Sequence, residues 1–266
     1  MKLAIEHDTI YRYDHPVRRS IQYLRLTPRS SARVRVLDWR LELPARAKAG
    51  IDAYGNTLHV LTLDVPHVDI HLRAVGTVET DDREADVETD NRLPPEVFLR
   101  DTPLSLADAA LSGFAAGFAG AVAADRRRGF EHLMVALAEH MPYTPGVTHA
   151  ATSAAEAFAG RLGVCQDHSH AMIACARRLG VPARYVSGYL ATDIEHVASH
   201  AWAELWMDGG WLGYDTSNLC LAASRHVKLA VGLDYLDACP VRGMRVGGGD
   251  EIMHIAARVV SSAADQ

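Results

Sequence analysis

The chain has 266 residues, a formal net charge of −6, and 48% hydrophobic and 23% charged residues. These values are typical of a globular protein with one large or two medium domains, and the negative charge argues against non-specific nucleic-acid binding. Residues 1–8 carry charges where a secretion signal needs an apolar run, and no uncharged apolar stretch reaches the roughly 20 residues of a membrane span. We therefore expect a cytoplasmic protein that binds neither nucleic acid nor membranes. The composition does not indicate an oligomeric state.

The chain contains few cysteines, and all of them lie in its second half. Their spacing is irregular and includes no CxxC pair, which argues against a disulfide framework and a structural zinc site. The four are Cys165, Cys175, Cys220 and Cys239.

The first 80 residues carry the pattern of half-buried strands. Apolar residues alternate with polar ones in residues 3–13, 37–43 and 70–78, and turn-forming residues separate these runs, including residues 52–56. Several such strands without a helical pattern predict a small antiparallel β-sandwich.

Residues 81–95 are rich in charge, lack apolar periodicity and end in a double proline, which is typical of a linker. We therefore predict an N-terminal domain over residues 1–92 and a second domain over residues 93–266. Helical periodicity follows at residues 105–124, 127–140, 153–158 and 165–179, and strand-like runs at 183–190, 200–207, 211–215 and 252–260. Helices followed by strands predict an α+β fold with an antiparallel sheet.

Three short stretches of the second domain carry reactive side chains. Cys165 follows Gly163-Val164 and opens a predicted helix, so its sulfur lies where the helix N-terminus favours negative charge. Its backbone N–H groups could also bind an oxyanion. His200 begins one predicted strand and Asp215 ends the next, and adjacent antiparallel strands would place the two side by side. A thiol, an imidazole and a carboxylate are the parts of a nucleophile, its base and the group that orients the base.

These stretches resemble a known family. Gly163-Val164-Cys165-Gln166-Asp167 with His170, Ser199-His200-Ala201-Trp202 and Gly213-Tyr214-Asp215-Thr216-Ser217-Asn218 look like the core motifs of bacterial transglutaminase-like proteins, which have a papain-like thiol core. The resemblance extends over the whole chain. Residues 7–13, 24–29 and 52–56 are similar to the β-rich N-terminal region of that family, and residues 240–243 and 247–249 to its C-terminal segment.

The resemblance implies that Cys165 is the nucleophile, His200 the general base and acid, and Asp215 the residue that orients the imidazole. An amide or isopeptide bond in a peptide or protein substrate would be attacked to form a thioester. Transfer to water would make the protein a peptidase or amidase, and transfer to an amine would make it a cross-linking enzyme. No metal or other cofactor is implied, and no acidic loop has calcium-ligand spacing.

Two other functions are consistent with the sequence. A peptide-binding protein could retain this fold without turnover. A metal-dependent hydrolase could use His168, His170, His196 and His200, although their spacing matches no ligand motif.

The remaining candidates border the predicted cleft. His168 stands where the family usually has an aromatic residue, three positions after Cys165. It either lines the cleft or is exposed or hydrogen-bonded elsewhere. Tyr143 could border the cleft, with a role in packing or in the oxyanion hole. Gln166 could contribute its side chain or only its backbone, and Trp202 is expected in the core or the cleft wall. Two further departures from the family are Ser169, where a small apolar residue is usual, and Thr216, where proline is usual.

Overall fold

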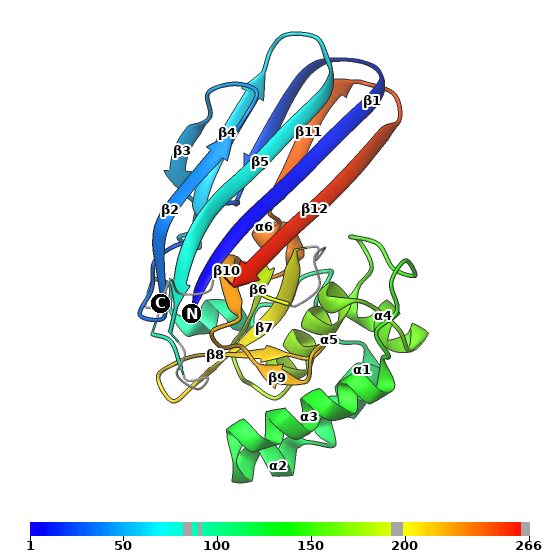
Figure 1. The fold of residues 1–266 in the computed structure, drawn as a ribbon. Coiled ribbons are helices and arrows are strands. Elements are labelled where there is room, and N and C mark those ends of the chain that lie inside the picture. Colours follow the sequence, from blue (N-terminus) through cyan, green and yellow to red (C-terminus); the bar gives the residue numbers. More distant parts are fainter. Residues whose placement is uncertain (82–86, 90–91, 193–198, 262–266) are drawn as a thin grey trace.

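A computed structural model of the chain describes residues 1–81, 87–89, 92–192 and 199–261. Among these residues it contains two antiparallel sheets and a group of helices (Figure 1). The α+β class predicted from the sequence is confirmed. Residues 82–86 and 90–91 of the predicted linker lie outside the described residues, as does His196 of the metal-site alternative.

The first sheet is built on the long strand β1, whose N-terminal half pairs with β5 and β12 and whose C-terminal half pairs with β4 and β11. Strand β2 extends the sheet beyond β5, and β3 extends it beyond β4. The sheet curls into a half-barrel (Figure 1). Its strands are β1 (Lys2–Leu24), β2 (Val34–Glu42), β3 (Lys48–Ile51), β4 (Thr57–Leu63), β5 (His67–Thr80), β11 (Val241–Gly247) and β12 (Glu251–Ser261).

The predicted N-terminal strands thus form one curled sheet, in which the last two strands of the chain also take part. The sequence interpretation placed β11 and β12 with the second domain, but both pair with β1. Alternating apolar residues indicate a half-buried strand and carry no information about its pairing partner, which is why the sequence did not place these strands.

The second sheet has the strand order β10-β6-β7-β8-β9 among the described residues. Its central strands are buried over nearly their whole length, since both faces are covered. This explains their continuous apolar runs. The strands are β6 (Ala183–Leu190), β7 (His200–Met207), β8 (Gly210–Asp215), β9 (Cys220–Leu221) and β10 (His226–Gly232).

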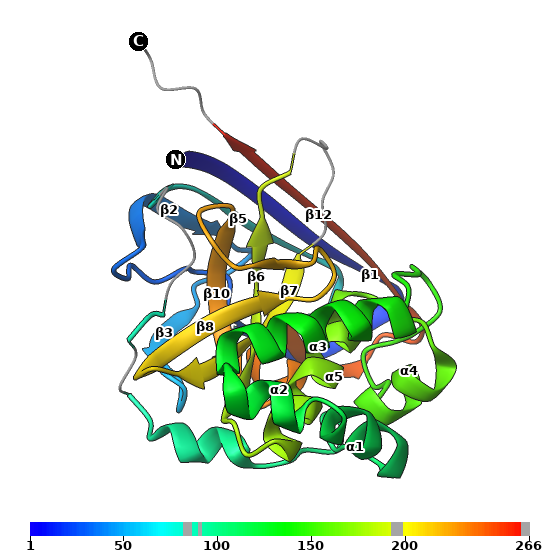
Figure 2. The same ribbon diagram turned by 90° about the horizontal axis from the view of Figure 1, so that it is seen from below.

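Helices cover one face of the second sheet, and the first sheet covers the other (Figures 1 and 2). The helices are the 3-10 helix η1 (Pro95–Leu99), α1 (Ala109–Ala116), α2 (Ala119–Ala124), α3 (Arg126–His140), α4 (Ala154–Gly160), α5 (Cys165–Arg178) and α6 (Tyr235–Ala238). No helix in the described part of the chain is both long and apolar enough to cross a lipid bilayer.

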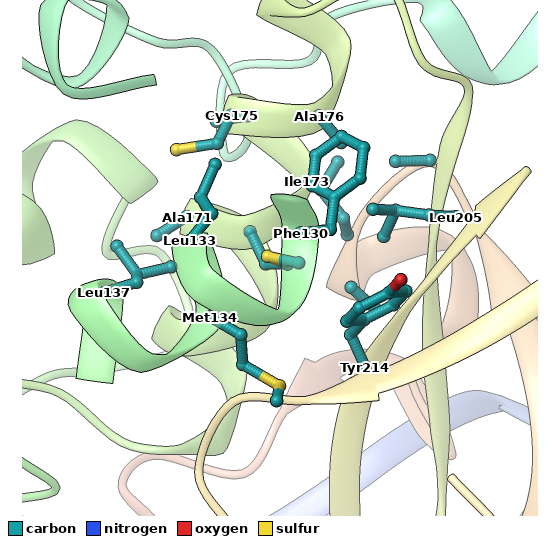
Figure 3. Packing of buried hydrophobic residues seen from close by; sticks show 14 of the residues in the cluster. Phe130, Leu133, Met134, Leu137, Ala171, Ile173, Cys175, Ala176, Leu205 and Tyr214 are labelled. Atoms are coloured by element: carbon teal, nitrogen blue, oxygen red, sulfur yellow. The ribbon is translucent and has the colours of Figure 1, made fainter. Parts of the chain in front are cut away.

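The largest apolar cluster holds α5 in place between α3 and the second sheet. In Figure 3, Phe130 of α3 lies beside Ile173 of α5, Leu133 and Leu137 follow along α3, and Leu205 of β7 lies on the sheet side. All five side chains are fully buried. Because packing density in such a core leaves little freedom, the first residue of α5 is held at a fixed place beside the strands.

Candidate active site

The first turn of α5 presents Cys165 as its first residue. The carboxylate of Asp167 caps this turn, since its Oδ2 atom accepts the Val164 N–H at 2.8 Å and the Thr148 hydroxyl at 2.7 Å. The cap leaves the N–H groups of Cys165 and Gln166 without intrahelical acceptors, as in any helix start. The half-buried sulfur therefore lies beside donors that can bind an anion.

The strands β7 and β8 bring His200 and Asp215 together, as the sequence predicted from their positions at neighbouring strand ends. Nε2 of His200 lies 2.7 Å from Oδ2 of Asp215. The thiol of Cys165 lies within hydrogen-bonding reach of the same imidazole. The three predicted residues are thus in contact in the order thiol, imidazole, carboxylate.

The electrostatics of this row favour an imidazolium. Burial lowers the pKa of His200, but the hydrogen bonds to Asp215 and Cys165 and the charges of both groups outweigh it and raise this pKa to about 10. Burial raises the pKa of Asp215, but hydrogen bonds from His200 and His226 outweigh it and lower this pKa far below its usual value. A protonated imidazole thus lies next to a sulfur at a helix N-terminus, where positive charge and backbone N–H donors can stabilise an anion.

The other candidates occupy different places around the row. Tyr143 is 53% exposed, and its ring lies 6.1 Å from that of His168, edge to face. The Gln166 side-chain amide donates to the Ala150 carbonyl at 3.2 Å and thus binds the segment before α4. Trp202 is only 2% exposed, and its indole stacks on the ring of His200 with centres 6.1 Å apart.

His168 is one of the departures from the family pattern, and it is buried and hydrogen-bonded. Its Nε2 donates to the Met141 carbonyl at 2.7 Å, and its Nδ1 lies 2.9 Å from the Ser217 hydroxyl. Burial lowers its pKa below the usual value for histidine. The neutral ring therefore ties α5 to the segments after α3 and after β8, both of which border the row.

Two residues at the row received no role from the sequence. Asn218 donates its side-chain amide to Oδ2 of Asp215 at 2.8 Å, and His226 places its Nε2 3.0 Å from the same oxygen. Asn218 lies within a recognised motif, but nothing in its spacing indicated a contact. His226 precedes a short alternating run, residues 227–231, and a histidine at the start of a strand was the signal by which His200 was found.

His200, Asp215 and His226 are also close enough to bind a metal ion, because one ligand atom from each lies within 4.8 Å of the others. The metal alternative from the sequence shares only His200 with this group. His168 is engaged as above, and His170 accepts the Tyr235 N–H at 3.1 Å with a pKa that burial and the nearby Arg177 lower to about 3.

A cavity of about 220 Å³ lies between the second sheet and residues 29–34, the segment that leads into β2. Trp202 and His226 line it, together with Glu204, Trp211 and Lys228. Cys165 is not among the described residues that line it, whereas His226 lines it and contacts Asp215.

The row therefore defines a thiol-imidazole-carboxylate site on a papain-like α+β core, and comparison with known proteins agrees. Residues 3–79 match the bacterial transglutaminase-like N-terminal region, and residues 113–216 match the transglutaminase-like superfamily. The uncharacterized protein ML0607 of Mycobacterium leprae is 30% identical over 93% of this chain and 94% of its own length. The uncharacterized protein Rv2569c of Mycobacterium tuberculosis is 30% identical over 91% of this chain and 87% of its own. The chain belongs to the bacterial transglutaminase-like proteins of this superfamily.

A solved structure has the same fold. It is a proposed cysteine protease from Cytophaga hutchinsonii, with a TM-score of 0.77, 23% sequence identity, and coverage of 99% of this chain and 92% of its own. At 23% identity this similarity establishes the shared fold only, and any activity must be argued from the residues of this chain.

Proposed function

We propose that this chain is a cysteine peptidase or amidase that cleaves an amide or isopeptide bond in a peptide or protein substrate through a thioester on Cys165. The observation that carries the proposal is the contact of Cys165, His200 and Asp215 in one row at the start of α5. The family membership and the proposed protease activity of the Cytophaga hutchinsonii protein support it.

The first half of the reaction uses the ion pair. The thiolate of Cys165 attacks the substrate carbonyl carbon, and the carbonyl oxygen becomes an oxyanion beside the free N–H groups of the first turn of α5. When the tetrahedral intermediate collapses, the C–N bond breaks and the His200 imidazolium gives its proton to the leaving amine. The thioester and a neutral His200 remain.

The second half restores the enzyme. Neutral His200 takes a proton from water as the water oxygen attacks the thioester carbonyl. Collapse breaks the C–S bond, releases a carboxylic acid and regenerates the thiolate beside the imidazolium. An amine in place of water would give a new amide, so the same intermediate serves hydrolysis and transfer. Throughout, Asp215 holds the imidazole in one orientation and stabilises its charged form.

The test is to incubate the protein with a mixed peptide library and measure products and the mass of any acyl group on Cys165. We expect cleavage that is lost in Cys165→Ala and reduced at least a hundredfold in His200→Ala. Adding a primary amine to the same reaction separates hydrolysis from transfer, because transfer gives a product with the amine attached.

The other thiols provide an internal control for the reactivity of Cys165. Burial raises the pKa of Cys175 to about 12 and that of Cys220 to about 11, and Cys220 is half-buried like Cys165. Iodoacetamide should therefore label Cys165 first at neutral pH. If Cys165 reacts no faster than Cys220 and no peptide is cleaved, the alternative of a binding protein without turnover replaces this proposal.

A further inference from the structure

Three donors converge on one oxygen of Asp215. Oδ2 accepts from His200 Nε2 at 2.7 Å, from Asn218 Nδ2 at 2.8 Å and from His226 Nε2 at 3.0 Å. Asp215 itself is fully buried, so these donors replace the water that a carboxylate needs to remain charged. One of them, His200, is the reacting base, and the mechanism above gives no task to His226.

The proton on His226 can be placed from its second nitrogen. Nδ1 of His226 accepts the Ala223 N–H at 3.2 Å, so this nitrogen carries a lone pair. The neutral ring must then carry its proton on Nε2, the nitrogen that faces Asp215. His226 is therefore a donor to the carboxylate, with its tautomer fixed by the backbone.

The ring of His226 is also held in place. The backbone N–H of His226 donates to the Ala223 carbonyl at 2.9 Å, and this hydrogen bond closes the turn before β10. The indole of Trp202 packs edge to face on His226, with ring centres 5.1 Å apart, and stacks on His200 at 6.1 Å. One buried indole thus packs against both imidazoles that meet Asp215.

We propose that His226 is a positioning residue for the thiol chemistry: it donates to the same Asp215 oxygen as the base and so holds the carboxylate charged and turned toward His200. This inference rests on the proposed function, because it assigns a task within the same row. It makes the site a row of four groups, Cys165, His200, Asp215 and His226.

A metal ion held by His200, Asp215 and His226 would be a different use of the same atoms. Such an ion would need a lone pair on Nε2 of His226, but the Ala223 N–H occupies Nδ1 and leaves the proton on Nε2. It would also need Nε2 of His200, which already donates to Asp215. The hydrogen bonds therefore favour the positioning role.

Two substitutions separate a donor from a packing role. His226→Phe fills the space beside Trp202 without a donor, whereas His226→Gln keeps an N–H that can reach Asp215. The readouts are the titration of His200, followed by NMR of histidine-labelled protein, and the pH at which iodoacetamide begins to label Cys165. Neither readout needs a substrate, so the inference can be judged even if no peptide is cleaved.

We expect His226→Phe to move the His200 titration to lower pH and to slow labelling of Cys165 at pH 7 about tenfold, since one hydrogen bond to a charged group is lost. In His226→Gln, the His200 titration and the labelling rate of Cys165 should both return most of the way to their wild-type values. His7→Leu is the matched control: His7 is a buried histidine with hydrogen bonds to Tyr189 and Thr9, and its loss should lower thermal stability without moving either readout.

Chemical rescue guards against a misfolded variant. His226→Gly opens the space of the ring to the adjacent cavity of about 220 Å³, and added imidazole should return the labelling rate toward that of wild type. The inference is overturned if folded His226→Phe keeps the wild-type titration and labelling profile. It is also overturned if purified protein binds one equivalent of zinc that His226→Gln loses.

Discussion

Asn56 and Val231 exchange two hydrogen bonds across the boundary between the two sheets. The Asn56 side-chain amide donates to the Val231 carbonyl at 2.8 Å, and the Val231 N–H donates back to Asn56 Oδ1 at 2.8 Å. Asp52 fixes the orientation of this amide, because its carboxylate accepts both the side-chain and the backbone N–H of Asn56. The turn at residues 52–56, a family motif in the sequence, is therefore the clamp that joins the first sheet to β10.

We expect Asn56→Ala to lower the free energy of unfolding by about 2–4 kcal/mol, because it leaves the buried N–H and C=O of Val231 without partners. Denaturant unfolding followed by tryptophan fluorescence measures this. Arg35→Ala is the control, since its ion pair with Glu79 is exposed and should contribute less than about 1 kcal/mol. Equal effects of the two substitutions would contradict the role of the clamp.

Arg177 on α5 is a buried guanidinium with four acceptors. It donates to the carbonyls of Phe98, Ala183 and Leu233 and to the Ser105 hydroxyl. Burial is the main reason that its pKa is lowered to about 10, although nearby carboxylates oppose this.

The planar fork of arginine reaches these acceptors from one position, which a lysine ammonium cannot do. We expect Arg177→Lys to destabilise the protein by about 3–5 kcal/mol, as for a buried charge that loses its partners. The neighbouring Arg178 is exposed, and Arg178→Lys should leave the thermal midpoint within a degree or two. A stable Arg177→Lys protein would show that the four bonds are replaceable.

Local patterns in the sequence were enough to find α3, α4, α5 and the three residues of the row, but not η1 or α6. The strands β6 and β7 lie where the apolar runs predicted them, and α5 begins at Cys165 because glycine, a cap residue and an apolar face agree there. The region expected as one helix at residues 105–124 is divided into α1 and α2 near Gly117, where the glycines lower helix propensity.

Pairing and burial were less accessible to sequence reasoning. The strand β10 was not predicted, and with it the contact of His226 with Asp215 was missed. That contact joins the end of β8 to the start of β10, which two other strands separate in the sheet. It depends on the turn at residues 223–226, so no residue spacing could have indicated it.

Gly163 precedes the nucleophile and has no room for a side chain. A Cβ atom there would come within 2.7 Å of the Asp167 Cβ and 2.9 Å of its Oδ2, the oxygen that caps Val164. We expect Gly163→Ala to displace this cap, lower stability by about 1–2 kcal/mol and slow labelling of Cys165 by iodoacetamide.

Gly160, at the end of α4, is the matched control for this substitution. A Cβ added there meets no atom within 4 Å, so Gly160→Ala should leave labelling unchanged and keep or slightly raise stability. Mass spectrometry of the labelled peptides and thermal unfolding measure both. Normal labelling of Cys165 in Gly163→Ala would show that the cap does not set the position of the sulfur.

The ion pair of His200 and Asp215 gives stability a defined dependence on pH. His200 has a pKa raised to about 10 in the folded protein, against about 6.5 for an unfolded histidine. A group whose pKa is higher in the folded protein stabilises the folded state fully at pH values below its unfolded pKa. This stabilisation is lost as the pH rises through the folded pKa. The stabilising effect of protonated His200 should therefore be present at pH 6 and decline between pH 6.5 and about 10.

The comparison of wild type with His200→Gln isolates this effect. We expect the difference in unfolding free energy to be largest at pH 6 and to shrink by up to about 1.4 kcal/mol per pH unit as pH rises toward 10. Denaturant unfolding at pH 6, 8 and 10 measures it, and His254→Gln on the exposed strand β12 should show no such trend. A difference that stays constant or widens with pH would mean that His200 is neutral in the folded protein, and the thiolate of Cys165 would then lack its counter-charge.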